Sequence, residues 1–226
     1  ALPAVLLIGY FAIGAVVYFI VSVKKGFYRD FEIENRSSTW VTSRPLRNYF
    51  VWLMRPAWIV IEKTGVPPNA LTTVSVFLTI NASLCIGFGR FALGGLLYVI
   101  ASICDYFDGR IAREHRLATK SGELLDSVLD RYSDGIVYIG LAWFYRDSWV
   151  LLAVMTAMLG TGLISYIRAK AESLTIKLNE GLMQRPERVL ILGTGVALSP
   201  IVEAILDPLN PRSEEHTSEL QSPNTI

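Results

Sequence analysis

The stretch "CDYFDGRIAREHRLATKSGELLDSVLDRYSD", from Cys104 to Asp134, puts acidic residues between two apolar segments. The segments before and after it, "FALGGLLYVIASI" and "GIVYIGLAWF", are apolar enough to lie in lipid. Carboxylates at the ends of membrane helices cost free energy unless another group neutralises them. The side chains concerned are Asp105, Asp108, Asp126, Asp130 and Asp134. Whatever neutralises them decides how the two helices pack and what the chain does.

The composition points to a membrane protein. Hydrophobic residues make up 52% of the 226 residues, and only 18% are charged, below the roughly 25% of an ordinary soluble domain. Apolar segments long enough to span a bilayer occupy 1–23, 69–89, 91–112, 122–145, 148–171 and 187–208. The segment 44–65 mixes Arg, Trp and Tyr with apolar residues, which favours an amphipathic helix in the interface, with a break at Pro56. We predict an all-α integral membrane protein, a polytopic helical bundle preceded by this interfacial helix.

The orientation follows from the basic residues. Lys and Arg are concentrated in the links 24–68, 113–121 and 168–188, which the positive-inside rule places in the cytoplasm. The aspartates then lie at the cytoplasmic ends of their helices. We therefore predict a multi-pass protein of the cell membrane whose site faces the cytoplasm. The net charge of +1 says little about partners, and no nucleic-acid partner is predicted.

The chain divides into four parts. We predict an extra N-terminal transmembrane helix at 1–23, a cytoplasmic linker at 24–43 and a membrane domain at 44–211. The segment "RSEEHTSELQS" at 212–222 matches the translation of a common sequencing-adapter oligonucleotide. We therefore expect residues 212–226 not to be native and exclude them from arguments about fold and function.

The spacing of the aspartates predicts a cation site. Asp105 and Asp108 are three residues apart and Asp126 and Asp130 four apart, so each pair shares one helix face. The link between the helices is short, so we expect antiparallel neighbours whose carboxylates converge. An all-oxygen set suits Mg²⁺, Mn²⁺ or Ca²⁺, and two metals suit four carboxylates and phosphoryl transfer. We expect Asp134, one turn further, either to orient a metal ligand or to form ion pairs, rather than to bind metal directly.

The same stretch carries a longer pattern. Asp105-x-x-Asp108-Gly109-x-x-Ala112-Arg113 is followed, after eight residues, by Gly122-x-x-x-Asp126-x-x-x-Asp130. At every fixed position this resembles the signature of the CDP-alcohol phosphotransferases, the class I CDP-alcohol phosphatidyltransferases. The resemblance implies homodimeric membrane enzymes that transfer a phosphatidyl group from CDP-diacylglycerol, or a relative such as CDP-archaeol, to an alcohol and release CMP.

The resemblance also implies roles for individual residues. Two Mg²⁺ or Mn²⁺ ions would be held by Asp105, Asp108, Asp126 and Asp130, and Asp130 would also be the catalytic base. The stretch "PPNALT" at 67–72 resembles the segment that meets the nucleotide in this family. The residues implied to contact the CDP-lipid are Pro68, Asn69, Ala70, Leu71, Thr72, Gly109, Ala112, Arg113, Thr119 and Gly122.

A narrower resemblance concerns the acceptor. The stretches "SYIRAKAES" at 165–173 and "GLMQRPER" at 181–188 are similar to the branch that makes phosphatidylinositol phosphate or its archaeal ether-lipid counterpart. That resemblance implies that the phosphate of inositol phosphate is bound by Arg168, Lys170, Arg185 and Arg188. The alternative for these four residues is anchoring of the helices by the positive-inside rule.

Other interpretations are open at this point. Glycerol 3-phosphate is the second candidate acceptor. An intramembrane prenyltransferase or a non-enzymatic divalent-cation transporter would also use acidic residues near membrane helices. The resemblance further implies a core of six spans, of which 69–208 supplies five, so we expect the sixth to be absent from this chain.

Overall fold

The computed structural model describes residues 2–26, 28, 44–115, 119–176 and 185–206. Within these ranges all regular structure is helical, which confirms the predicted fold class. The predicted linker 24–43 lies almost wholly outside the described residues, and 212–226 lies entirely outside them. The helices are α1 (Leu2–Lys25), α3 (Arg44–Thr64), α4 (Pro68–Gly87), α5 (Phe91–Glu114), α6 (Lys120–Phe144), α7 (Val150–Ser173) and α8 (Arg185–Leu206).

Five of the described helices are long and apolar enough to cross a membrane: α1, α4, α5, α7 and α8. These five helices coincide with five of the six predicted spans. The sixth predicted span, 122–145, is helical as α6 but does not have this composition, because charged residues such as Asp130 and Arg131 occupy its first half. The acidic part of the chain is therefore a helix of the bundle whose charged half needs cover from its neighbours.

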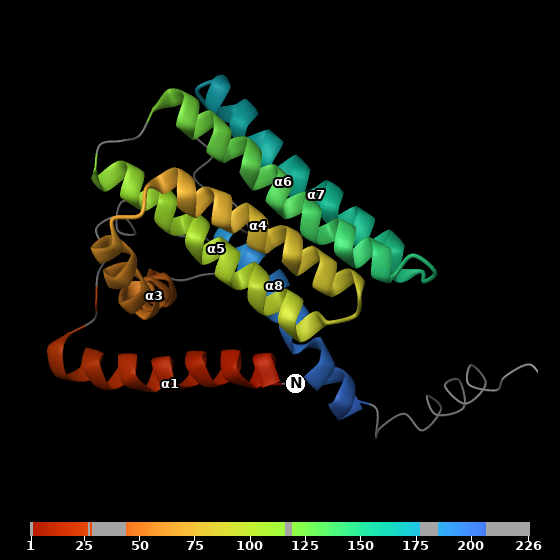
Figure 1. Ribbon diagram of the computed structural model, residues 1–226, viewed down its shortest axis with the longest axis horizontal. Helices are drawn as coiled ribbons and strands as arrows, with labels where there is room; N and C mark the ends of the chain where they lie inside the picture. The colour runs from red at the N-terminus through yellow and green to blue at the C-terminus, as the bar shows by residue number, and fades with distance from the viewer. Residues whose placement is uncertain (1, 27, 29–43, 116–118, 177–184, 207–226) are drawn as a thin grey trace, which may run out of the picture.

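The bundle is organised around α4 and α5. Figure 1 shows α4 running beside α5 and α6, with α7 beyond α6 and α8 behind α5. A turn at 88–90 joins α4 to α5, and Gly89 takes a positive φ of 76° there. The two helices are thus antiparallel. This arrangement brings the C-terminal half of α5 and the N-terminal half of α6 to the same end of the bundle.

Close helix approach depends on small residues. A Cβ atom added at Gly95 of α5 would overlap the backbone of Ala197 in α8. A Cβ atom at Gly140 of α6 would similarly overlap the backbone of Ser83 in α4, and the Ser83 hydroxyl donates to the Ile136 carbonyl at 2.6 Å. Membrane helices commonly pack through small residues in this way. These two crossings place α6 and α8 around the central pair.

The helices α1 and α3 form a separate aromatic layer against the bundle. The Tyr49 hydroxyl donates to the Phe11 carbonyl at 2.6 Å, and the Tyr10 hydroxyl donates to the Leu53 carbonyl at 2.8 Å. Figure 1 shows α1 lying across the lower end of the bundle. The predicted break at Pro56 is wrong, since α3 continues through this residue, whose ring lies on the exposed side of the helix.

Candidate active site

Three carboxylates from α5 and α6 meet beside α4, which packs against both helices, so the two acidic helices are not the closely packed neighbours that the sequence predicted. One oxygen each from Asp105, Asp108 and Asp126 lies within 4.8 Å of the others. Asp108 is buried, with 3% of its surface exposed, and the other two are half-buried. Carboxylates this close repel one another unless a cation lies between them. The donor set consists of oxygen atoms alone, so it fits a hard divalent cation such as Mg²⁺ or Mn²⁺.

Asp130 lies one turn beyond Asp126 but is not part of this group of three. Its Oδ1 atom is 2.8 Å from Nη1 of Arg185, and the same nitrogen donates to Oδ2 of Asp105 at 2.6 Å. One guanidinium group therefore bridges α5 and α6. The structure thus places Asp130 beside the carboxylates but pairs it with an arginine from α8, and its role as ligand and base stays a prediction.

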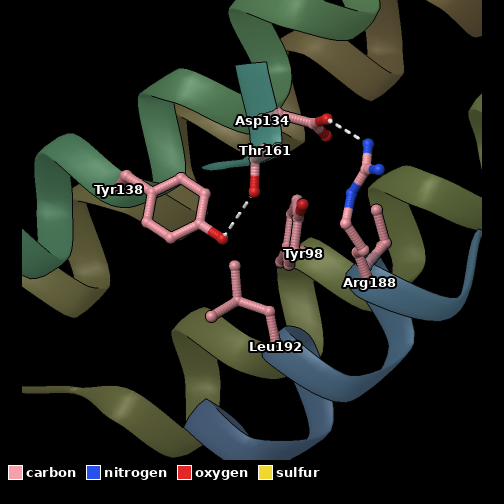
Figure 2. A pocket seen from close by; sticks show the side chains of 7 residues that line it. Tyr98, Asp134, Tyr138, Thr161, Arg188 and Leu192 are labelled. Carbon is pink, nitrogen blue, oxygen red and sulfur yellow. Dashed lines mark hydrogen bonds and ion pairs between the residues drawn. The ribbon is translucent and has the colours of Figure 1, made fainter. Parts of the chain in front are cut away.

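Asp134 extends the charged cluster toward the interior. Its two oxygens lie 3.6 Å from Nε of Arg185 and 3.9 Å from Nη2 of Arg188. The ion-pair role predicted for Asp134 is confirmed. Figure 2 shows Asp134 and Arg188 facing each other across the space between α6 and α8.

The first turn of α8 supplies both arginines. Pro186 lies in this turn, where a missing N–H costs no helical hydrogen bond. Glu187 is the acidic residue of the turn, which suits the positive end of a helix dipole. Its Oε1 atom is 3.3 Å from Nη2 of Arg47 in α3. Neither Glu187 nor Arg47 was predicted as a site residue, although Glu187 stands between the two arginines in "RPER".

The start of α4 lies next to the carboxylates. The helix begins at Pro68, and the predicted nucleotide-contacting residues 68–72 form its first turn and the residue after it. The Thr72 hydroxyl donates to Oδ2 of Asp108. Leu71 is buried in a cluster with Phe107 and Ile111, while Asn69 is exposed and Ala70 half-buried. The structure therefore brings this segment to the acidic site, and Thr72 contacts it directly.

The remaining motif residues lie at the rim. The Arg113 side chain lies over Gly109, because a Cβ atom there would come within 3.1 Å of Nη1 of Arg113. Ala112 is half-buried beside them. Thr119 caps α6, and its hydroxyl oxygen accepts from the Gly122 backbone N–H at 3.1 Å. Thr119 and Gly122 thus have a visible role in starting the helix that carries Asp126, and their predicted contact with the nucleotide stays a prediction.

The predicted acceptor residues separate into two groups. Arg185 and Arg188 contact the aspartates, and Arg188 also donates to the Ser165 hydroxyl in α7 at 3.3 Å. Arg168 and Lys170 are exposed in the last turns of α7. Within the described part of the chain, neither of their side chains forms an ion pair. The structure therefore brings two of the four basic residues to the site.

A small cavity adjoins the arginines between α5, α6, α7 and α8. The Tyr138 hydroxyl lies 3.1 Å from the Thr161 hydroxyl at its wall, as Figure 2 shows. Tyr98 lies two turns before Asp105, and Tyr138 lies one turn after Asp134, so helical spacing from the aspartates is the signal that could have found both tyrosines. The residues that line this cavity include Tyr98, Asp134, Tyr138, Thr161, Arg188 and Leu192.

The comparison with known families decides the assignment. The model of the CDP-alcohol phosphatidyltransferase family matches residues 66–206. The chain belongs to this family. The match begins just before α4 and ends with α8, so it covers the bundle that carries the carboxylates and leaves out α1 and α3.

Named relatives and solved structures agree with the family. The phosphatidylinositol phosphate synthase of Mycobacterium tuberculosis is 31% identical over 158 residues, covering 68% of this chain and 73% of the relative. That of Mycobacteroides abscessus is 29% identical over 158 residues, covering 68% and 72%. The Mycobacterium tuberculosis enzyme with CDP-DAG bound superposes with a TM-score of 0.56 at 30% identity, covering 64% of this chain and 75% of that one.

A second structure of that enzyme contains a metal. The complex with manganese and citrate has a TM-score of 0.56 at 29% identity, covering 64% of this chain and 71% of that one. Together with the cluster of Asp105, Asp108 and Asp126, this identifies the chain as a metal-dependent transferase of the membrane. The prenyltransferase and the cation transporter receive no support.

Proposed function

We propose that this chain transfers the phosphatidyl group of CDP-diacylglycerol to inositol phosphate and releases CMP. The observation that carries the acceptor is the pair Arg185 and Arg188, which points into the carboxylate cluster from α8. Two guanidinium groups suit a phosphorylated alcohol better than a neutral one, because arginine binds phosphate through paired hydrogen bonds. The names of the relatives support inositol phosphate over glycerol 3-phosphate.

The metal set is the first part of the proposal. Asp105, Asp108 and Asp126 would hold one divalent cation, and Asp130 would complete the set for a second. Bound Mg²⁺ or Mn²⁺ neutralises the diphosphate and polarises its phosphoryl oxygens. The Thr72 hydroxyl orients Asp108 by its hydrogen bond, which keeps one carboxylate oxygen available.

The donor would bind where α4 begins. The start of α4 at 68–72 and the side chain of Arg113 flank the carboxylates, and Arg113 is exposed and able to bind a phosphate. We propose CDP-diacylglycerol rather than CDP-archaeol as the donor, which the CDP-DAG complex of a relative supports. The acyl chains would then lie along the lipid-facing surface of the bundle.

Asp130 is the proposed base. It would accept the proton of the attacking hydroxyl as that oxygen bonds to the β-phosphorus, while the bond from the β-phosphorus to CMP breaks. Nη1 of Arg185 lies 2.8 Å from Oδ1 of Asp130 and so occupies an oxygen that would accept the proton. The phosphate of the acceptor would take over Arg185 and so leave Asp130 free to accept the proton.

The finer placement in the cell is part of the same proposal. The site would face the cytoplasm, because the links 113–121 and 168–188, which adjoin the helices of the site in the sequence, are rich in Lys and Arg. The protein would act as a homodimer in the cell membrane. Size measurement in detergent and protease accessibility of the basic links in sealed vesicles test these two points.

The activity is tested by product identification. Detergent-purified protein is incubated with CDP-diacylglycerol, Mn²⁺ or Mg²⁺ and, in parallel, inositol phosphate, glycerol 3-phosphate, inositol or serine. We expect CMP release and phosphatidylinositol phosphate with inositol phosphate, and none after chelation with EDTA. Product from glycerol 3-phosphate alone would show that the acceptor is wrong, and product from all four alcohols would show that the arginines do not select a phosphate.

A further inference from the structure

The first turn of α8 carries charge on two faces. Arg185 and Arg188 are three residues apart and share the face that meets the carboxylates. At about 100° per residue, Glu187 lies roughly 200° around the helix from Arg185, toward α3. The rotation of this single turn therefore decides whether the two arginines meet the aspartates.

The opposite face is held by an ion pair that is largely buried. Nη2 of Arg47 lies 3.3 Å from Oε1 of Glu187, and their side chains are only 14% and 6% exposed. The two residues are 140 positions apart in the chain, so the pair links α3 to α8 across the fold. Breaking a buried pair by removing one partner is far more costly than breaking an exposed one.

The helix α3 is a suitable support for this pair because it is itself anchored. It contacts α1 through the Tyr49 hydroxyl, and its Trp58 ring packs against Phe107 of α5 with centroids 5.6 Å apart. The guanidinium group of Arg110, within the α5 motif, lies 4.8 Å from the centre of the same Trp58 ring. One interfacial helix thus touches both the acidic α5 and the basic α8.

We propose that Arg47 and Glu187 are positioning residues for acceptor binding. Their ion pair sets the rotation of the α8 first turn, so that Arg185 and Arg188 present their guanidinium groups to the phosphate of the acceptor. The inference rests on the proposed function, because it assigns that phosphate to the two arginines. It adds a part of the chain, α3, that lies outside the matched family region.

Charge reversal with rescue tests the pair. The variants Arg47→Glu, Glu187→Arg and the double variant are purified, and kcat and KM are measured for inositol phosphate and for CDP-diacylglycerol. We expect each single reversal to raise the KM for inositol phosphate at least about tenfold, with the KM for CDP-diacylglycerol changed less than about twofold. The double variant restores the KM for inositol phosphate to within about threefold of the wild type.

Two controls separate positioning from folding. Lys63→Glu makes the same charge change at an exposed site in the last turn of α3 and should leave both KM values unchanged. If the charge reversals do not yield folded protein, Arg47→Lys and Glu187→Gln replace them, the first keeping the charge and the second removing it. We then expect Glu187→Gln to raise the acceptor KM more than Arg47→Lys does.

The outcomes distinguish this inference from the proposed function. If the wild type uses another phosphorylated alcohol, the proposed acceptor is wrong, and the same KM comparison with that alcohol tests the pair. The inference is overturned if the single variants lower kcat and thermal stability together with an unchanged acceptor KM. It is also overturned if the double variant shows no recovery.

Discussion

The acidic and the basic side of the site are built in different ways. The carboxylates belong to α5 and α6, which follow each other in the chain, and Gly140 packs α6 closely on α4. The guanidinium groups belong to the first turn of α8, where side-chain ion pairs reach Asp105, Asp130 and Asp134. The acidic side is therefore positioned by backbone packing, and the basic side by long side chains that can exchange partners.

This difference suits two separate tasks, metal binding on the acidic side and phosphate binding on the basic side. Divalent cations require ligand oxygens at fixed short distances, which close helix packing supplies. An incoming phosphate instead needs basic side chains that can exchange a carboxylate for the phosphate. Arg185 is suited to this exchange because it contacts two carboxylates, at 2.6 and 2.8 Å, through one flexible side chain. The comparison predicts that changes on the acidic side reduce turnover, whereas changes on the basic side weaken acceptor binding.

The largest effect is expected at Asp130. Asp130→Asn keeps the size of the side chain but removes the proposed base, so kcat should fall by about a thousandfold. The measurement is CMP release by purified protein whose folding is checked by size-exclusion chromatography. Asp147→Asn, at a side chain that is 88% exposed beyond α6, is the matched control and should retain full activity. Turnover of Asp130→Asn close to that of the control would rule out Asp130 as the base.

A smaller and different effect is expected at Arg185. Arg185→Gln removes the cation that bridges Asp105 and Asp130, so the KM for inositol phosphate should rise by about a hundredfold. Binding of Mn²⁺ in the absence of substrates should become tighter, because a guanidinium group no longer competes with the metal for these carboxylates.

Titration with Mn²⁺, followed by electron paramagnetic resonance, measures the change in metal affinity without any turnover. Arg146→Gln is the control, since Arg146 is exposed and pairs with Asp147 at the other end of α6. Weaker or unchanged Mn²⁺ binding in Arg185→Gln, relative to this control, would contradict competition between the arginine and the metal.

The acidic side could be predicted from the sequence because its geometry is local. The spacing of Asp105 and Asp108, together with the short link to Asp126, leaves few ways to keep these carboxylates apart. Helical periodicity also predicted that Asp134 forms ion pairs, although its partners on α8 were not foreseen. The sixth predicted span stays a prediction, because the same charges fill the first half of α6 and lower its apolar character.

The basic side could not be predicted because it depends on how distant helices pack. The pairing of α5 with α8 requires the close approach of Gly95 to the backbone of Ala197, and the sequence does not state which glycine meets which helix. The acceptor prediction therefore treated Arg168 and Arg185 alike, although of these two residues Arg185 alone contacts the aspartates. The contact of Arg47 with Glu187 had no local signal at all, since it joins residues 140 positions apart.

The smallest effect is expected at Thr72, whose hydroxyl orients the Asp108 carboxylate by a hydrogen bond. Thr72→Val removes the hydroxyl that donates to Asp108 while keeping the shape of the side chain, so Mn²⁺ affinity should fall by about tenfold. Thr73→Val is the matched control, because among the described residues the Thr73 hydroxyl bonds only to the Asn69 carbonyl within α4, on the exposed side of the helix. Equal Mn²⁺ affinities in the two variants would mean that helix packing alone orients Asp108. A loss confined to Thr72→Val would mean that a single hydrogen bond from α4 supplements that packing, so that the start of α4 helps to orient the proposed metal ligand Asp108.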